Sequence, residues 1–252
     1  RQPKGFDFFQ NEINGYRLLS EVGCRIPKLL FADEQNRMIG LEYITGSVLE
    51  EGKENEYYEK CVELYCDTYK KIALLSPSDK LFFRSPEGIF EGMELLIKYA
   101  GFNPHDEFIK FAKNSYDLIV KSQKKVNIGS FIPPNIIRGD TDYHIDLEMI
   151  SKGTETDDIS YFVLFAGTQS DNLINMFQSK IDYRQDIFFA SLLHLSVLTA
   201  GIYSEDITVN DTINKRKNKT RLLNFAHSLQ GIRTSLFNEL IDVLVRQNDR
   251  NL

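Results

Sequence analysis

The chain has 252 residues and a net charge of −6, and 42% of its residues are hydrophobic against 26% that are charged. That hydrophobic share supports a buried core and excludes an intrinsically disordered chain. The acidic balance argues against a general nucleic-acid binder, because affinity for phosphates rests on lysine and arginine. The mean hydropathy of −0.30 predicts no membrane-spanning segment.

The three cysteines, Cys24, Cys61 and Cys66, are scattered along the sequence. They show no CxxC spacing, and no Cys/His motif typical of a metal site accompanies them. Reduced cysteines of this kind are typical of an intracellular compartment. We also expect no signal peptide. Together these features predict a cytoplasmic protein.

The first part of the chain predicts two helices separated by a hairpin. Apolar residues at helical spacing favour a helix over 6–22, which Gly23 would end. Two strand-like runs, 28–32 and 38–43, flank a polar turn and predict the hairpin. Helical spacing then returns over 54–75.

The remainder of the chain is mostly helical and contains a second predicted hairpin. A loop with Pro133-Pro134 leads to Arg138-Gly139-Asp140, and the runs 145–150 and 154–159 are expected to pair. Further helices are predicted at 88–100, 106–122, 171–178, 183–202, 215–229 and 235–247. The sequence therefore indicates an α+β chain, rich in helices, in which two small hairpins interrupt the helices.

Three aspartates are candidates for chemistry. Asp140 directly follows a short apolar strand, where a carboxylate could accept the proton of a substrate hydroxyl, although it could equally cap its own turn. Asp146 lies at the start of the expected second hairpin and Asp158 at its far end, and the hairpin would bring their carboxylates close together. Carboxylate oxygens are the ligands that Mg²⁺ prefers. The other interpretation of Asp158 is a solvated acidic residue at a strand end.

Two segments carry an ordered set of motifs. The first holds Glu12 on a helix, then I-P-K-L-L at 26–30 and L-E-Y-I-T-G at 41–46. The second holds R-G-D at 138–140, D-D-I-S-Y at 157–161, Gly167 and Asp171. This set resembles the aminoglycoside phosphotransferase and choline kinase family of kinase-like enzymes. The family order is an acidic helix, G-x-x-V/I-P-K-x-L, M/L-E-Y-I-x-G, H-G-D with a nearby Asn, I-D-F/W-E and G-x-x-x-D.

The resemblance implies a protein kinase-like fold with two lobes. We expect residues 1–45 to be the remnant of a truncated N-terminal lobe and residues 46–252 to form a helical C-terminal lobe. The implied activity is the ATP- and Mg²⁺-dependent phosphorylation of a hydroxyl on a small molecule such as an aminoglycoside, choline or a sugar. We expect a monomer or homodimer that binds neither nucleic acid nor membrane.

The resemblance also implies roles for single residues. Asp140 would be the catalytic base, and Asp146 and Asp158 would hold the magnesium ion. Glu12 would orient a lysine that grips the nucleotide phosphates. The backbone at Glu42, Tyr43 and Ile44 would meet the adenine.

Several positions depart from the family pattern. The histidine of H-G-D is Arg138, the metal-binding Asn counted from Asp140 is Ile145, and a strict count back from Gly167 puts Ser160 at the metal Asp. The only lysine before Glu12 is Lys4, so we expect the phosphate-gripping lysine and its strands to lie upstream of the sequence. The alternative is a catalytically inactive, kinase-like protein that binds a nucleotide or a partner.

Overall fold

The computed structural model describes residues 7–48, 57–77, 81–122, 124–129, 131–209, 214–232 and 235–249. The chain divides into two compact units. The first comprises residues 1–84, 123–158 and 176–181, and the second comprises residues 85–122, 159–175 and 182–252. Segments of the two units alternate along the chain, and residue 45 lies inside the first unit. The division into lobes 1–45 and 46–252 therefore stays a prediction.

The first unit combines two helices with several short strands. Its helices are α1 (Phe8–Glu21) and α2 (Tyr58–Ile72). Its strands are β1 (Leu29–Asp33), β2 (Met38–Leu41), β3 (Ser47–Val48), β4 (Phe82–Phe83), β5 (Lys125–Asn127), β6 (Ile136–Arg138), β7 (Tyr143–His144) and β8 (Ser151–Gly153).

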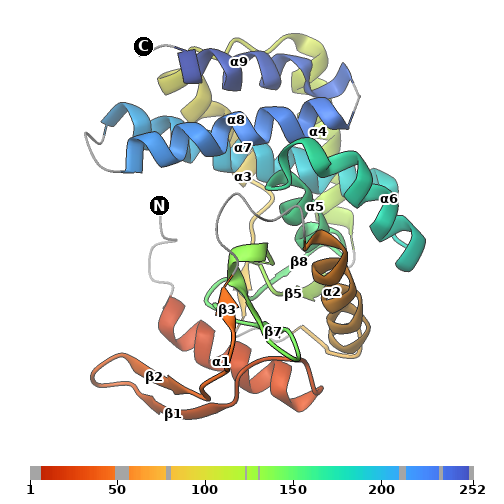
Figure 1. Cartoon of the computed structure of the whole chain (residues 1–252). Coiled ribbons are helices and arrows are strands. Elements are labelled where there is room, and N and C mark those ends of the chain that lie inside the picture. Colours follow the sequence, from red (N-terminus) through yellow and green to blue (C-terminus); the bar gives the residue numbers. More distant parts are fainter. Residues whose placement is uncertain are drawn as a thin grey trace. The chain divides into compact units, whose positions relative to one another are not determined.

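Helix α1 and the β1–β2 hairpin confirm the predicted start of the chain, and Figure 1 shows them side by side. The Asp7 side chain caps α1 by accepting a hydrogen bond from the Gln10 amide at 3.3 Å. Gly23, with φ +69°, follows the helix in the left-handed conformation that glycine adopts without strain. Ile13 and Leu19 are fully buried, so the apolar stripe of α1 faces the core as its spacing predicts.

Two three-stranded sheets join segments that lie far apart in the sequence. One sheet has the order β3-β6-β7, and the other has the order β4-β8-β5. Strand β6 pairs antiparallel with both β3 and β7, whereas β8 pairs parallel with β4 and antiparallel with β5. The strands are two or three residues long, so tertiary pairing rather than local propensity sets their positions.

The second hairpin differs from the prediction in its position. It is formed by β6 and β7, with Gly139 and Asp140 in its turn. Residues 145–150 contain no strand, and 154–159 lead into a helix, α5 (Asp157–Leu164). At the start of this helix, the Asp157 carboxylate accepts from the Thr154 amide at 3.1 Å and from the Thr154 hydroxyl at 2.7 Å, which holds the turn that precedes the helix.

The second unit is helical, and most of its predicted helices are confirmed. Helix α5 continues into this unit from the first, and α6 begins here and ends in the first unit. The helices are α3 (Gly88–Leu95), the π-helical η2 (Leu96–Ala100), α4 (Asp106–Lys121), α6 (Ser170–Lys180), α7 (Gln185–Val209), α8 (Asn214–Gly231) and α9 (Asn238–Asp249). Figure 1 shows α8 beside α9, and these two helices make extensive contacts.

Helix α7 is the central helix of this unit and packs against α3, α4 and α8. It is long and apolar enough to cross a membrane, but 72% of its most apolar window is buried inside the structure. Gly92 and Gly201 let α3 and α7 approach closely: a Cβ on Gly92 would lie 2.5 Å from the carbonyl oxygen of Val197. These features are those of a core helix.

Candidate functional site

Helix α1 is fixed against the segment that follows Asp146. The Asn11 side chain, which is buried, donates hydrogen bonds to the carbonyls of Glu148 at 2.7 Å and Ile150 at 2.8 Å. Gly15 sits so close to this segment that an added Cβ would lie 3.1 Å from Leu147 and from Ile150. Glu12, next to Asn11 on the helix, is thereby held near Asp146.

Asp146 and Asn135 come together although neither lies in a regular strand. The amide of Ile145 donates to the carbonyl of Asn135 at 2.9 Å, and the Asn135 side chain hydrogen-bonds the Asp146 carboxylate. Asp146 has a φ of +63°, a strained conformation for a residue with a side chain. Burial raises the pKa of Asp146, and the bond from Asn135 lowers it in part. The left-handed backbone and the hydrogen bond from Asn135 make Asp146 a candidate site residue.

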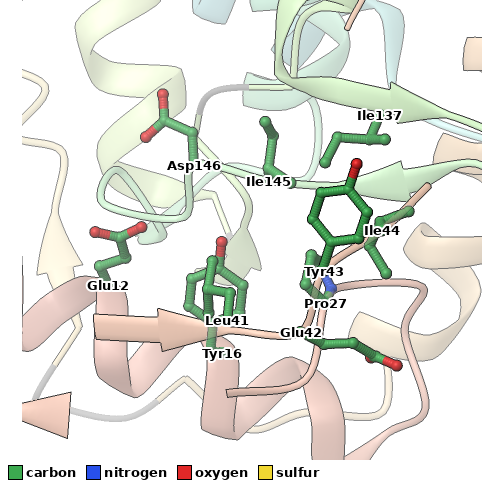
Figure 2. A pocket seen from close by; sticks show the side chains of 10 residues that line it. All are labelled: Glu12, Tyr16, Pro27, Leu41, Glu42, Tyr43, Ile44, Ile137, Ile145 and Asp146. Carbon is green, nitrogen blue, oxygen red and sulfur yellow. The ribbon is translucent and has the colours of Figure 1, made fainter. Parts of the chain in front are cut away.

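A pocket of about 490 Å³ lies between α1, the end of β2 and the β6–β7 region. Figure 2 shows the carboxylates of Glu12 and Asp146 at one side of this pocket. The other lining residues are mainly apolar: Tyr16, Pro27, Leu41, Glu42, Tyr43, Ile44, Ile137 and Ile145. No lysine or arginine is among these described lining residues, so the pocket combines an apolar wall with an acidic end.

The residues expected to meet the adenine, Glu42, Tyr43 and Ile44, all line this pocket. The Glu42 amide donates to the Lys28 carbonyl at 2.8 Å, which continues the pairing of the β1–β2 hairpin past its last strand residue. Tyr43 is 87% exposed. The structure therefore brings the expected hinge to the same pocket as Glu12 and Asp146.

The acidic end of the pocket carries unfavourable repulsion. Burial raises the pKa of Glu12 to about 7, and the negative charges of Asp146 and Glu148 add to the shift. The pKa of Glu148 is also raised, by burial and by Asp146. Among the described residues, no three His, Cys, Asp or Glu side chains are arranged to hold a metal ion by themselves. A cation here would therefore also need an amide oxygen, which Asn135 can supply.

The raised pKa of Glu12, caused by burial and then by the neighbouring carboxylates, predicts that Glu12→Gln stabilises the protein. A carboxyl whose pKa is raised on folding favours the folded state below its ordinary pKa and loses that contribution as the pH rises through about 7. Because the Glu12 side chain is half exposed, solvent screening reduces the free energy that corresponds to its raised pKa. Glu12→Gln should therefore add about 1–2 kcal/mol to the free energy of unfolding at pH 8. The gain should vanish near pH 4. Urea unfolding at both pH values measures this gain, with the exposed Glu21→Gln as the control on the same helix. Equal stability of Glu12→Gln and wild type at pH 8 would refute the raised pKa of Glu12.

Asp140 lies in the turn of the second hairpin. It is exposed in the turn between β6 and β7 and does not line the pocket. Its neighbour Arg138 stacks its guanidinium on the Tyr57 ring, 3.5 Å from the ring centre, and so ties the hairpin to the start of α2. This placement favours the turn interpretation of Asp140 over the catalytic one.

Asp158 makes buried structural contacts, and its expected role as a metal ligand stays a prediction. It is 1% exposed, and its two carboxylate oxygens accept the amides of Ile128 at 2.9 Å and Gly129 at 2.8 Å. It sits on α5 because the expected strand there is a helix, so no hairpin returns it to Asp146. The strict-count position, Ser160, donates to the carbonyl of Phe188 at 3.2 Å and is also buried.

A different register of the family pattern fits the structure. Ile145-Asp146-Leu147-Glu148 matches I-D-F/W-E, and Asn135 lies against Asp146. Counting back five positions from Asn135, as the pattern requires between its Asp and its Asn, leads to Ser130 after Gly129. Ser130 and Lys4 lie outside the described residues. Asn135 is thus the site residue that the sequence analysis missed, although the spacing contained the signal.

Comparison with solved structures shows the class of fold: the chain has the kinase-like fold of choline kinases and aminoglycoside phosphotransferases. No protein-family model matches the chain, and no curated protein matches it. The suspected resemblance and the α+β kinase-like fold are therefore confirmed at the level of the fold.

Three solved structures illustrate the similarity. A choline/ethanolamine kinase family protein from Mesorhizobium loti has a TM-score of 0.68 at 12% identity, covering 94% of this chain and 84% of that one. Choline kinase LicA from Streptococcus pneumoniae gives 0.57 at 15% identity, covering 89% and 80%. Amicoumacin kinase hAmiN, in complex with AMP-PNP, Ca²⁺ and Ami, gives 0.58 at 9% identity, covering 90% and 79%.

Proposed function

We propose that this chain binds ATP together with Mg²⁺ in the pocket and holds the nucleotide without efficient phosphoryl transfer. The observation that carries the proposal is that one pocket is lined both by the expected hinge, Glu42–Ile44, and by Glu12 and Asp146. An apolar wall beside the main chain of the expected hinge suits a planar base, and hard oxygen ligands suit the cation that accompanies phosphates.

The charges of the site make the cation necessary. The charges of Asp146 and Glu148 raise the pKa of Glu12, and the charge of Asp146 raises the pKa of Glu148. The described lining of the pocket offers phosphates no positive side chain. Phosphates alone would therefore be repelled. Asp146, with the Asn135 amide beside it, is the main ligand that we assign to Mg²⁺, which neutralises phosphate charge when bound. AMP-PNP and Ca²⁺ in the amicoumacin kinase complex support this assignment.

The same positions argue against rapid transfer. A general base contributes about 10²–10⁴-fold to a rate. In the register that fits the structure, the residue at the position of the base is Ser130, which is not a carboxylic acid. Asp140, the carboxylate assigned from the sequence, lies in an exposed turn outside the pocket.

The second candidate is an active phosphotransferase that acts on a small-molecule hydroxyl. It is favoured by the solved structures with this fold, which include choline and amicoumacin kinases. Under this candidate Asp140 is the base, and a lysine upstream of Glu12 grips the phosphates.

Two substitutions separate the candidates. We expect Asp146→Asn to lose the extra rise in melting temperature that Mg²⁺ with ATP gives over ATP alone, because the main ligand of the cation is weakened. Asp140→Asn should keep that rise in full. Transfer of labelled γ-phosphate to choline and to streptomycin is measured in parallel. Wild-type transfer that falls by about 10²-fold or more in Asp140→Asn would support the second candidate and contradict ours.

A further inference from the structure

Arg84 is a buried cation with no assigned role. It follows β4 and is only 8% exposed. Its amide donates to the carbonyl of Lys152 at 3.3 Å, which extends the parallel pairing of β4 with β8 by one residue. Its guanidinium donates to the carbonyl of Gly129 at 3.2 Å. A buried guanidinium must direct its donors to specific acceptors, and the acceptor that it reaches here belongs to an irregular loop.

The peptide groups around Gly129 are held from both directions. Asp158 accepts the amides of Ile128 and Gly129, while Arg84 donates to the carbonyl of Gly129. Gly129 has a φ of +83°, and an added Cβ would lie 1.8 Å from the carbonyl oxygen of Met149. The backbone conformation is therefore fixed at the residue before Ser130.

The two ends of the loop are fixed by different contacts. At its start, the Asn127 side chain donates to the Thr154 carbonyl at 3.0 Å, and β5 pairs with β8. At its end, the Asn135 carbonyl accepts the Ile145 amide beside Asp146. The loop from Gly129 to Asn135 thus begins at the Arg84 contact and ends at the proposed cation ligands.

We propose that Arg84 is a positioning residue for the start of this loop: by holding the Gly129 carbonyl opposite Asp158, it fixes the peptide groups of Ile128 and Gly129, from which the sequence continues to Asn135. Arg84 does not touch the pocket and acts through the loop. The link from the loop to ligand binding rests on the proposed function, whereas the fixation of Gly129 does not.

The test compares Arg84→Met, which keeps the apolar stem but removes the donors, with Arg84→Lys, which restores a charged donor. The exposed Arg37, paired with Asp7 at 2.8 Å in the same unit, gives the control Arg37→Met. Amide hydrogen exchange is followed by NMR at Ile128 and Gly129 and, for comparison, in α9. The rise in melting temperature with ATP and Mg²⁺ is measured on the same proteins.

We expect Arg84→Met to exchange at least about 10-fold faster at Ile128 and Gly129, with α9 unchanged, and to lose most of the Mg²⁺–ATP response. Arg84→Lys should recover part of both, and Arg37→Met should match wild type. Unchanged exchange at Ile128 and Gly129, or faster exchange spread equally over α9, would overturn the positioning role. If wild type itself shows no Mg²⁺–ATP response, the proposed function fails, and local exchange alone decides the role of Arg84.

Discussion

Gly129→Ala is expected to lower the free energy of unfolding by about 3 kcal/mol or more. An alanine there must adopt a φ of +83°, and its Cβ would overlap the carbonyl oxygen of Met149, 1.8 Å away. The Met149 oxygen is a backbone atom, and the Gly129 amide and carbonyl are held by Asp158 and Arg84, so the overlap cannot be relieved by a side-chain movement. Chemical denaturation of the purified variant measures the loss.

Gly23→Ala is the matched control for this substitution. Gly23 has a similar φ of +69°, but nothing lies within 4 Å of its added Cβ. It should therefore cost only the conformational term, about 1–2 kcal/mol. Equal losses for the two variants would show that the overlap with Met149 does not exist in solution.

Asp158→Ala is expected to cost about 3 kcal/mol or more, because it leaves the buried amides of Ile128 and Gly129 without acceptors. Asp140→Ala, in the exposed turn, should stay within about 0.5 kcal/mol of wild type. If Asp158 were a solvated residue, the two alanine variants would be equally stable. Urea unfolding of both variants separates these outcomes.

The pH dependence gives a second signature of Asp158. Burial raises its pKa to about 6, although the two amides and Arg84 lower it in part. Its contribution to stability is therefore fully present below its ordinary pKa and is lost as the pH rises through about 6. Asp158→Asn removes this dependence, so its loss of stability relative to wild type should be larger at pH 4 than at pH 7. A constant difference would contradict the raised pKa.

Much of the fold followed from patterns that are local in the sequence. The amphipathic spacing of residues 6–22 and the turn between 28–32 and 38–43 correspond to α1 and the β1–β2 hairpin. The long helices α4, α7 and α8 also lie where apolar periodicity placed them. In each case one buried face, repeated over several turns or strand residues, carries the signal.

The second hairpin could not be placed in this way. Strands β6 and β7 have three and two residues, and their partners come from distant segments. The alternation of apolar and polar residues therefore gave no register for these strands. The hydrogen bonds from Thr154 to the Asp157 carboxylate hold a turn that leads into α5 in place of the expected strand. Asn135 was missed for a different reason: the family pattern was counted forward from Asp140, and the backbone contact between Asn135 and Ile145, next to Asp146, shows the register in which the spacing fits.

Calorimetric titration of the wild-type chain with ATP, with and without Mg²⁺, tests the central claim most directly. Because the acidic end of the pocket offers phosphates no positive side chain among its described lining residues, we predict saturable one-site binding with Mg²⁺ and at least about 10-fold weaker binding without it, a difference of about 1.4 kcal/mol. Asp146→Asn should remove that difference. Equal affinity for ATP with and without Mg²⁺, or no binding in either condition, would contradict the assignment of this pocket to a nucleotide and its cation.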